Sequence, residues 1–316
     1  MKLIIQIPCY NEAATLAVAL RELPRSVEGF DRVEWLVIDD GSTDATAEAA
    51  KANGVDHVVR FAKNRGLARA FMAGVDACLK LGADVIVNTD ADNQYRAADI
   101  PLLTKPILER KAELVIGARP IAEIRHFPLI KKLLQKMGSR VVRLASRTDV
   151  PDAPSGFRAI SREAALRLNV FNDYTYTLET IIQAGQKNMA VTSVAVRVNE
   201  DLRPSRLVKS IPSYLRKSLV TIIRIFVVYK PFRFFMSVGL SFFGLGFLVG
   251  LRFLYYYVTE GSAGHVQSLI LASIMMGIGG QTMLVAFLAD LLAVNRRLME
   301  DVQYMLRKTE SDTRNL

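Results

Sequence analysis

Carboxylates follow short apolar runs at several points in the first third of this 316-residue sequence. Asp90 and Asp92 come directly after Val85–Asn88, and Gln94 stands two residues further on. Carboxylate and amide oxygens are preferred ligands of Mg²⁺ and Mn²⁺, which usually complete their shells with water and substrate phosphates. A pair of aspartates one residue apart is a weak signal by itself, because loop carboxylates are common. Its place at the end of a buried run strengthens the prediction of a divalent metal site.

A second acidic pair, Asp39 and Asp40, follows the apolar run Trp35–Ile38. Carboxylates at a strand end can hydrogen-bond a nucleotide base or ribose, which is the role we expect here. Asp44 has a plainer interpretation, the capping of the helix that follows. The sequence contains neither G-x-G-x-x-G nor G-x-x-x-x-G-K-[ST], which argues against a dinucleotide oxidoreductase and a P-loop NTPase.

Alternating strands and helices must position these residues. The apolar runs predict three buried strands, over Leu3–Ile7, Trp35–Ile38 and Val85–Asn88. A last strand is predicted over Val191–Val198. Helical patterns cover Ala13–Leu23, Ala45–Asn53, Leu67–Leu81 and Pro128–Ser146. This rhythm predicts an α/β fold with a mostly parallel sheet, whose ligands bind beyond the carboxyl ends of the strands. The acidic pairs fall at those ends.

The C-terminal part has a different character. Residues 201–316 carry 14 Lys and Arg against seven Asp and Glu, and the whole chain has a net charge of +10. Leu215, Leu219, Ile222 and Phe226 recur at helical spacing among basic residues, which predicts an amphipathic helix on an anionic membrane surface. A basic helix packed on a soluble domain is the alternative. We expect a lipid bilayer as the partner of this segment, and no nucleic acid.

Two apolar segments follow, and each is long enough to cross about 30 Å of hydrocarbon. Phe234–Leu251 has 18 residues without a charge, and Leu269–Leu288 has 20 residues with one strongly polar side chain, Gln281. The alternative, two buried helices of a globular core, lacks other segments to bury them. Residues 259–265 contain no Lys or Arg, whereas the outer flanks do, so the positive-inside rule places both termini in the cytoplasm.

These patterns predict four regions and a location. The regions are a cytoplasmic catalytic domain (1–200), a basic membrane-interface segment (201–233), two transmembrane helices (234–292, about 234–258 and 266–290) and a cytoplasmic tail (293–316). The predicted location is the cell inner membrane. Small residues at helical spacing let membrane helices approach closely, so a homo-oligomer is a further hypothesis. They are Ser237/Ser241, Gly246/Gly250 and Ser273/Gly277.

Six short motifs follow one another along the first 235 residues. They are Ile7–Pro8–Cys9–Tyr10–Asn11–Glu12, Ile38–Asp39–Asp40–Gly41–Ser42, Asn64–Arg65–Gly66, Asp90–Ala91–Asp92–Asn93–Gln94, Asp152-x-x-Ser155–Gly156–Phe157–Arg158 and Arg203–Pro204–Ser205–Arg206–Leu207. Taken together in this order, they resemble family 2 glycosyltransferases with a GT-A-type, Rossmann-like nucleotide-sugar domain. The similarity covers about residues 1–235, and the chain resembles most the subgroup that makes dolichyl- or undecaprenyl-phosphate sugars, in its bacterial form with two transmembrane helices. Tyr95–Arg96 replaces a His-Pro pair common in relatives, and leaves the role of Tyr95 open.

The resemblance implies a role for each matching position. The nucleotide pocket would be lined by Pro8, Tyr10, Glu12, Ile38, Asp39, Asp40, Asp90 and Ala91. Asp90, Asp92 and Gln94 would hold Mg²⁺ or Mn²⁺ with the diphosphate. The donor and acceptor phosphates would be bound by Arg119, Lys131 or Lys132, Ser155, Arg158, Arg203 and Arg206. Asp92, Arg158 and Arg203 would act in catalysis itself.

The chemistry expected is transfer of a sugar from a UDP- or GDP-sugar to a polyprenyl phosphate. A phosphate monoester is largely anionic at neutral pH, so it can attack the anomeric carbon in one inverting displacement without a strong general base. A polysaccharide synthase is the first alternative, but the only tryptophan, Trp35, lies in a strand rather than in a Q-x-x-R-W motif. A catalytically silent membrane scaffold that binds nucleotide is the second, and the intact metal motif argues against it.

Overall fold

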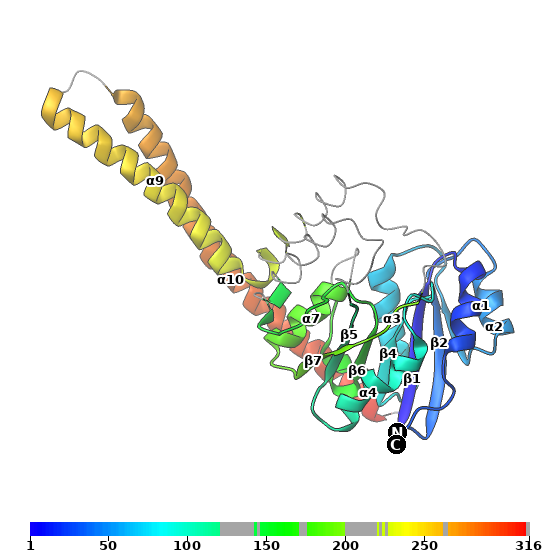
Figure 1. The fold of residues 1–316 in the computed structure, drawn as a ribbon. Coiled ribbons are helices and arrows are strands. Elements are labelled where there is room, and N and C mark those ends of the chain that lie inside the picture. Colours follow the sequence, from blue (N-terminus) through cyan, green and yellow to red (C-terminus); the bar gives the residue numbers. More distant parts are fainter. Residues whose placement is uncertain are drawn as a thin grey trace. The chain divides into compact units, whose positions relative to one another are not determined.

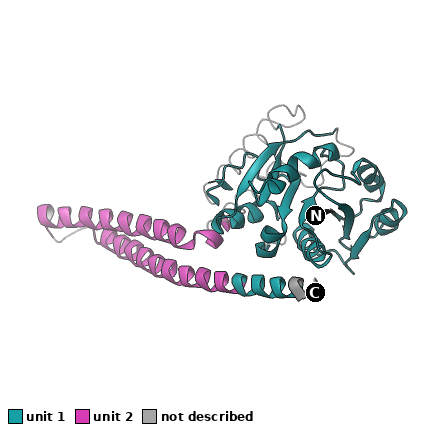
Figure 2. Cartoon of the chain, turned by 90° about the horizontal axis from the view of Figure 1, so that it is seen from below, with its two compact units in different colours: residues 1–218, 300–316 teal, residues 219–299 magenta. Residues whose placement is uncertain are grey.

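The computed structural model describes residues 1–120, 142–143, 146–170, 176–199, 220, 223–224, 227–261 and 265–313. The chain divides into two compact units, residues 1–218 with 300–316 and residues 219–299 (Figure 2). The Pro128–Ser146 helix and the basic amphipathic segment lie almost wholly outside the described residues.

The first unit is built on a seven-stranded sheet (Figure 1). Its strand order is β3-β2-β1-β4-β6-β5-β7, and every pairing is parallel except those of β6 with β4 and β5. The strands are β1 Lys2–Cys9, β2 Arg32–Asp39, β3 His57–Arg60, β4 Val85–Asn88, β5 Leu114–Ala118, β6 Arg158–Ser161 and β7 Val191–Ala195. The predicted α/β fold with a mostly parallel sheet is confirmed.

Helices cover this sheet. They are α1 Ala13–Glu22, α2 Thr46–Ala52, α3 Leu67–Lys80, α4 Ile100–Leu108, α6 Arg162–Arg167 and α7 Thr177–Gln186, with a short 3₁₀ helix, η1, at Ala97–Asp99. β1 is buried along seven of its eight residues because it lies between β2 and β4 with helices packed on it. Its inward residues Leu3, Ile5 and Ile7 join the main hydrophobic core, which is the reason the run lacks polar alternation.

Three strands were not expected from the sequence. β3, β5 and β6 have four or five residues each, too few for a clear periodic pattern. β7 ends at Ala195 rather than at Val198, although Val198 still forms a single bridge to Tyr95. β3 forms one edge of the sheet beside β2, whereas β6, β5 and β7 complete it beyond β4, and the loop that contains Gly156 precedes β6.

The second unit contains most of two long helices, α9 Pro231–Glu260 and α10 Val266–Thr313. Both are long and apolar enough to cross a membrane, and most of their large apolar side chains are exposed. They pack closely at glycine: a Cβ at Gly279 would lie 2.6 Å from the backbone nitrogen of Phe243. Gly277, in contrast, faces open space. This helix pair agrees with the predicted transmembrane hairpin.

The last turns of α10 belong to the first unit. Arg307 donates hydrogen bonds to the Leu168 carbonyl at 2.7 Å and forms an ion pair with Asp76 at 3.0 Å. The Tyr304 hydroxyl lies 3.0 Å from a carboxylate oxygen of Glu163. These contacts attach the end of the chain to α3 and α6.

Candidate active site

Three acidic strand ends meet at one edge of the sheet, because β2, β1 and β4 are parallel neighbours. The loops after β1 and β2 are hydrogen-bonded to each other. The Asn11 amide donates to the Ser42 hydroxyl at 2.9 Å, and the Glu12 amide donates to the Thr46 hydroxyl at 2.9 Å. The expected nucleotide residues that follow β1 and β2 are therefore held in one rigid frame.

Asp39 and Asp40 have different surroundings. Asp39 is fully buried, accepts the Ser42 amide at 2.9 Å and forms an ion pair with Arg60 at 3.1 Å. The two carboxylate oxygens of Asp40 accept the backbone amides of Arg65 and Gly66 at 2.7 and 2.9 Å. Burial raises the pKa of Asp40, although these two amides oppose the shift. Asp40 thus joins the second and third sequence motifs.

Most of the remaining predicted nucleotide-pocket residues are buried. Pro8, Ile38 and Ala91 are buried, and Glu12 is 8 % exposed. Tyr10 differs, because its side chain is 42 % exposed at the end of β1. An exposed aromatic ring beside a buried carboxylate frame can stack on a planar base.

The metal motif lies on the adjacent strand end. The backbone amide of Gln94 donates to a carboxylate oxygen of Asp92 at 3.2 Å, and the Asp90 carboxyl lies close by. Burial and the negative charge of Asp92 together raise the pKa of Asp90 to about 7. Two carboxylates that resist joint ionisation fit a divalent cation, which would neutralise both. The donor set of two carboxylates and one amide suits Mg²⁺ or Mn²⁺.

Arg119 connects the metal motif to the loop before β6. Its Nε donates to Asp152 at 2.7 Å and its second terminal nitrogen donates to the other carboxylate oxygen at 3.0 Å. The remaining terminal nitrogen donates to the Gln94 side-chain oxygen at 3.1 Å. The Asp152 side chain is 1 % exposed and that of Arg119 is 10 % exposed. A bidentate buried pair therefore fixes a positive charge beside the metal motif.

Ser155, in the loop before β6, and Arg158, the first residue of β6, lie deeper. Both are fully buried. The Arg158 guanidinium donates to the carbonyls of Ser155 and Thr177 and lies 5.1 Å from the Tyr176 ring. Burial lowers the pKa of Arg158. The structure places this side chain behind the loop, where it braces the backbone.

A buried polar network that the sequence analysis did not anticipate surrounds Gly156. The Asn88 side-chain amide donates to the Gly156 carbonyl at 2.9 Å and to the Tyr176 hydroxyl at 2.8 Å. Gln6 donates to the Asn88 side chain at 2.9 Å from the neighbouring strand. The one available signal was Asn88 itself, a polar residue that ends an apolar strand.

Part of the predicted phosphate-binding set lies outside the described residues. These residues are Lys131, Lys132, Arg203 and Arg206. Arg119 and Ser155 are described and lie at the metal motif and in the loop before β6, respectively.

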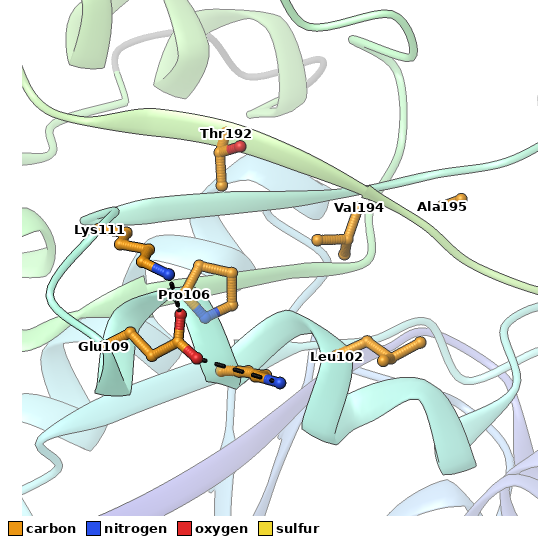
Figure 3. A pocket seen from close by; sticks show the side chains of 8 residues that line it. Leu102, Pro106, Glu109, Lys111, Thr192, Val194 and Ala195 are labelled. Carbon is orange, nitrogen blue, oxygen red and sulfur yellow. Dashed lines mark ion pairs between the residues drawn. The ribbon is translucent and has the colours of Figure 1, made fainter.

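A separate cavity of about 500 Å³ lies between α4 and β7 (Figure 3). Leu102, Pro106 and Val194 supply its apolar lining, and Lys111 forms an ion pair with Glu109 at 2.7 Å beside it. Among the predicted site residues that the structure describes, none lines this cavity.

Residues 4–168, just over half of the chain, match the family model of glycosyl transferase family 2. The chain belongs to this family. As a family 2 glycosyltransferase it is similar to an undecaprenyl-phosphate mannosyltransferase of Micrococcus luteus, with 32% identity over 50% of this chain and 66% of that protein. It is also similar along nearly its whole length to the glycosyltransferase AglJ of Haloferax volcanii, with 28% identity over 94% of this chain and 95% of the relative.

The glycosyltransferase unit shares its fold with a solved structure of glucosyl-3-phosphoglycerate synthase from Mycobacterium tuberculosis in complex with Mn²⁺, UDP and phosphoglyceric acid. The TM-score is 0.56 at 21% identity, over 72% of this chain and 77% of that one. The expected GT-A-type fold is confirmed, and the chain is a glycosyltransferase.

Proposed function

We propose that this glycosyltransferase transfers a sugar from a UDP- or GDP-sugar to a polyprenyl phosphate at the cytoplasmic face of the inner membrane. One observation carries the proposal: the same chain contains buried, clustered carboxylates that suit a divalent cation and two helices long and apolar enough for a bilayer. The similar protein of M. luteus is an undecaprenyl-phosphate mannosyltransferase, which supports this acceptor class.

In the proposed mechanism Asp90, Asp92 and Gln94 would hold a divalent cation, which neutralises charge on the leaving diphosphate when bound. Tyr10 and Asp40 bind the nucleoside, and Arg119 adds a fixed positive charge beside the diphosphate because Asp152 holds its guanidinium. Such prearranged charge lowers the barrier without reorganisation during the reaction. Arg158 acts as a positioning residue that holds the loop from behind.

The acceptor phosphate needs no strong general base, because its second pKa is near 6. Neither described histidine lies at the carboxyl end of a strand. His57 begins β3 and lies 2.8 Å from Glu34, and His265 precedes α10. The acceptor phosphate would therefore attack directly and invert the anomeric carbon. Arg203 and Arg206 are proposed to bind it, and Arg203 lies four residues after Asn199, which is hydrogen-bonded to the Gln94 carbonyl at 2.8 Å.

The positive-inside distribution supports the orientation proposed. Lys230 and Arg233 precede α9 or lie in its first turn, and Arg296 and Arg297 lie after the apolar part of α10, on the side assigned to the cytoplasm. With this orientation the catalytic unit would face the cytoplasm, the side on which we propose that the polyprenyl phosphate head group is used. A polysaccharide synthase remains the alternative within the family, with a sugar polymer as its product.

A panel of labelled UDP- and GDP-sugars tests the proposal with the full-length protein, polyprenyl phosphate and Mn²⁺ or Mg²⁺. We expect one donor to yield a labelled, inverted lipid monosaccharide, and Asp92→Ala to lower the yield at least about 100-fold because a metal ligand is lost. Labelled polymer would support the alternative. Retained configuration, or no labelled lipid with any donor, would contradict the proposal.

A further inference from the structure

Tyr95 lies directly after the metal motif, and its side chain is committed to the neighbouring loop. Its hydroxyl accepts the Gly156 amide at 3.0 Å. Its ring stacks on Phe157, with centroids 5.0 Å apart and an interplanar angle of 20°. Tyr95 is 3 % exposed, so these contacts are shielded from water. One side chain therefore joins the metal motif to the segment between Asp152 and Arg158.

The backbone around Tyr95 binds a third segment. Tyr95 forms an antiparallel bridge with Val198. On either side of it, the Asn199 amide donates to the Gln94 carbonyl at 2.8 Å, and the Arg96 amide donates to the Arg197 carbonyl at 3.3 Å. The short segment after β7 is thereby held along the metal motif. Its backbone and the Gly156 loop share Tyr95 as their common attachment.

Gly156 packs so closely against the Asp90 carboxylate that no side chain fits between them. A Cβ at Gly156 would lie 2.8 Å from both carboxylate oxygens of Asp90 and 3.0 Å from the Tyr176 hydroxyl. Asn88 holds the carbonyl of Gly156 and Tyr95 holds its amide, so the peptide is fixed from both ends. A small shift of this loop would therefore change how the Gly156 peptide lies against the Asp90 carboxylate.

We propose that Tyr95 is a positioning residue that sets the distance between the metal motif and the loop that contains Gly156. The inference rests on the proposed function, in which donor diphosphate and acceptor phosphate must be held in line. Removal of the hydroxyl frees the Gly156 amide while the ring stack on Phe157 stays. The nucleotide frame, built from the loops after β1 and β2, does not include Tyr95 and is unaffected.

The test is Tyr95→Phe in the full-length protein, with Tyr304→Phe as the matched control. Tyr304 also loses one hydrogen bond, to Glu163, but lies on α10 outside the site. In Tyr95→Phe we expect amide exchange in a peptide covering residues 152–158 to accelerate about tenfold at Gly156, and kcat for lipid transfer to fall about tenfold. The donor KM should change less than twofold. Tyr304→Phe should change none of these.

Any other result contradicts a specific part of the proposal. If the Gly156 amide of Tyr95→Phe exchanges at the wild-type rate, the Tyr95 hydroxyl does not hold this loop. If exchange is faster but kcat is unchanged, Tyr95 has no role in positioning. A rise in donor KM that matches the fall in kcat would indicate general damage to the fold rather than positioning. If the wild type transfers no sugar to lipid, the proposed function fails, while the exchange comparison still tests whether the Tyr95 hydroxyl holds this loop.

Discussion

The buried ion pair between Arg119 and Asp152 allows a quantitative prediction for Asp152→Asn. The substitution removes the charge that faces the guanidinium at 2.7 and 3.0 Å but leaves the Arg119 side chain only 10 % exposed. Removal of one partner from a buried pair costs about 3–5 kcal/mol, because the other charge stays out of water. With a urea m-value of about 2–3 kcal/mol per molar, the unfolding midpoint should fall by about 1–2.5 M.

The only tryptophan provides the assay. Trp35 lies in β2, is 6 % exposed and has the Arg25 guanidinium 3.4 Å above its ring, so its fluorescence reports unfolding of the catalytic unit. Asp149→Asn is the matched control, because Asp149 is 95 % exposed in its pair with Arg143 and should shift nothing measurable. Arg119→Met combined with Asp152→Asn should recover part of the loss. Equal midpoints for Asp152→Asn and Asp149→Asn would refute the reasoning.

Two further predictions follow from the metal motif and the helix pair. Because the folded protein raises the pKa of Asp90 from 3.8 to about 7, the stability that this group contributes is present below pH 3.8 and is lost as the pH rises through about 7. Mn²⁺ should therefore stabilise the protein more at pH 8 than at pH 5 in the Trp35 assay, and equal stabilisation would contradict the assignment. In the hairpin, Gly279→Leu should accelerate amide exchange in a peptide around Phe243, whereas Gly277→Leu, which faces open space, should not; equal effects would exclude close packing at Gly279.

Much of the fold could be predicted from the sequence, because its central strands are continuous apolar runs that end in acidic residues. β1, β2 and β4 have this pattern, and their adjacency follows from the βαβ rhythm. β6 could not be predicted, since Arg158–Ser161 contains a buried arginine and only four residues. Its antiparallel place between β4 and β5 depends on contacts with residues far away in sequence.

The candidate site was predicted as a set of residue types, and the structure distinguishes roles within it. Sequence patterns treat Asp39 and Asp40 alike, yet one is paired with Arg60 and the other binds two backbone amides. The motif predicts Arg158 as a phosphate ligand but does not report depth, and the structure shows that this side chain is fully buried. The network of Asn88, Tyr95 and Tyr176 was missed because its members are separated in sequence and only the fold brings them together.

The compensation of charge around the strand ends explains why Asp90 and Asp92 are suited to a cation. Asp152 is matched by Arg119 and Asp39 by Arg60, so those carboxylates are stabilised by the protein itself. Asp90 is not stabilised in this way: Arg119 and Arg158 oppose the rise of its pKa, but burial and Asp92 outweigh them. A group that the fold leaves costly to ionise becomes favourable once a divalent ion arrives. We therefore expect the metal affinity of this site to rise when the nucleotide binds, because its diphosphate would supply the remaining ligands.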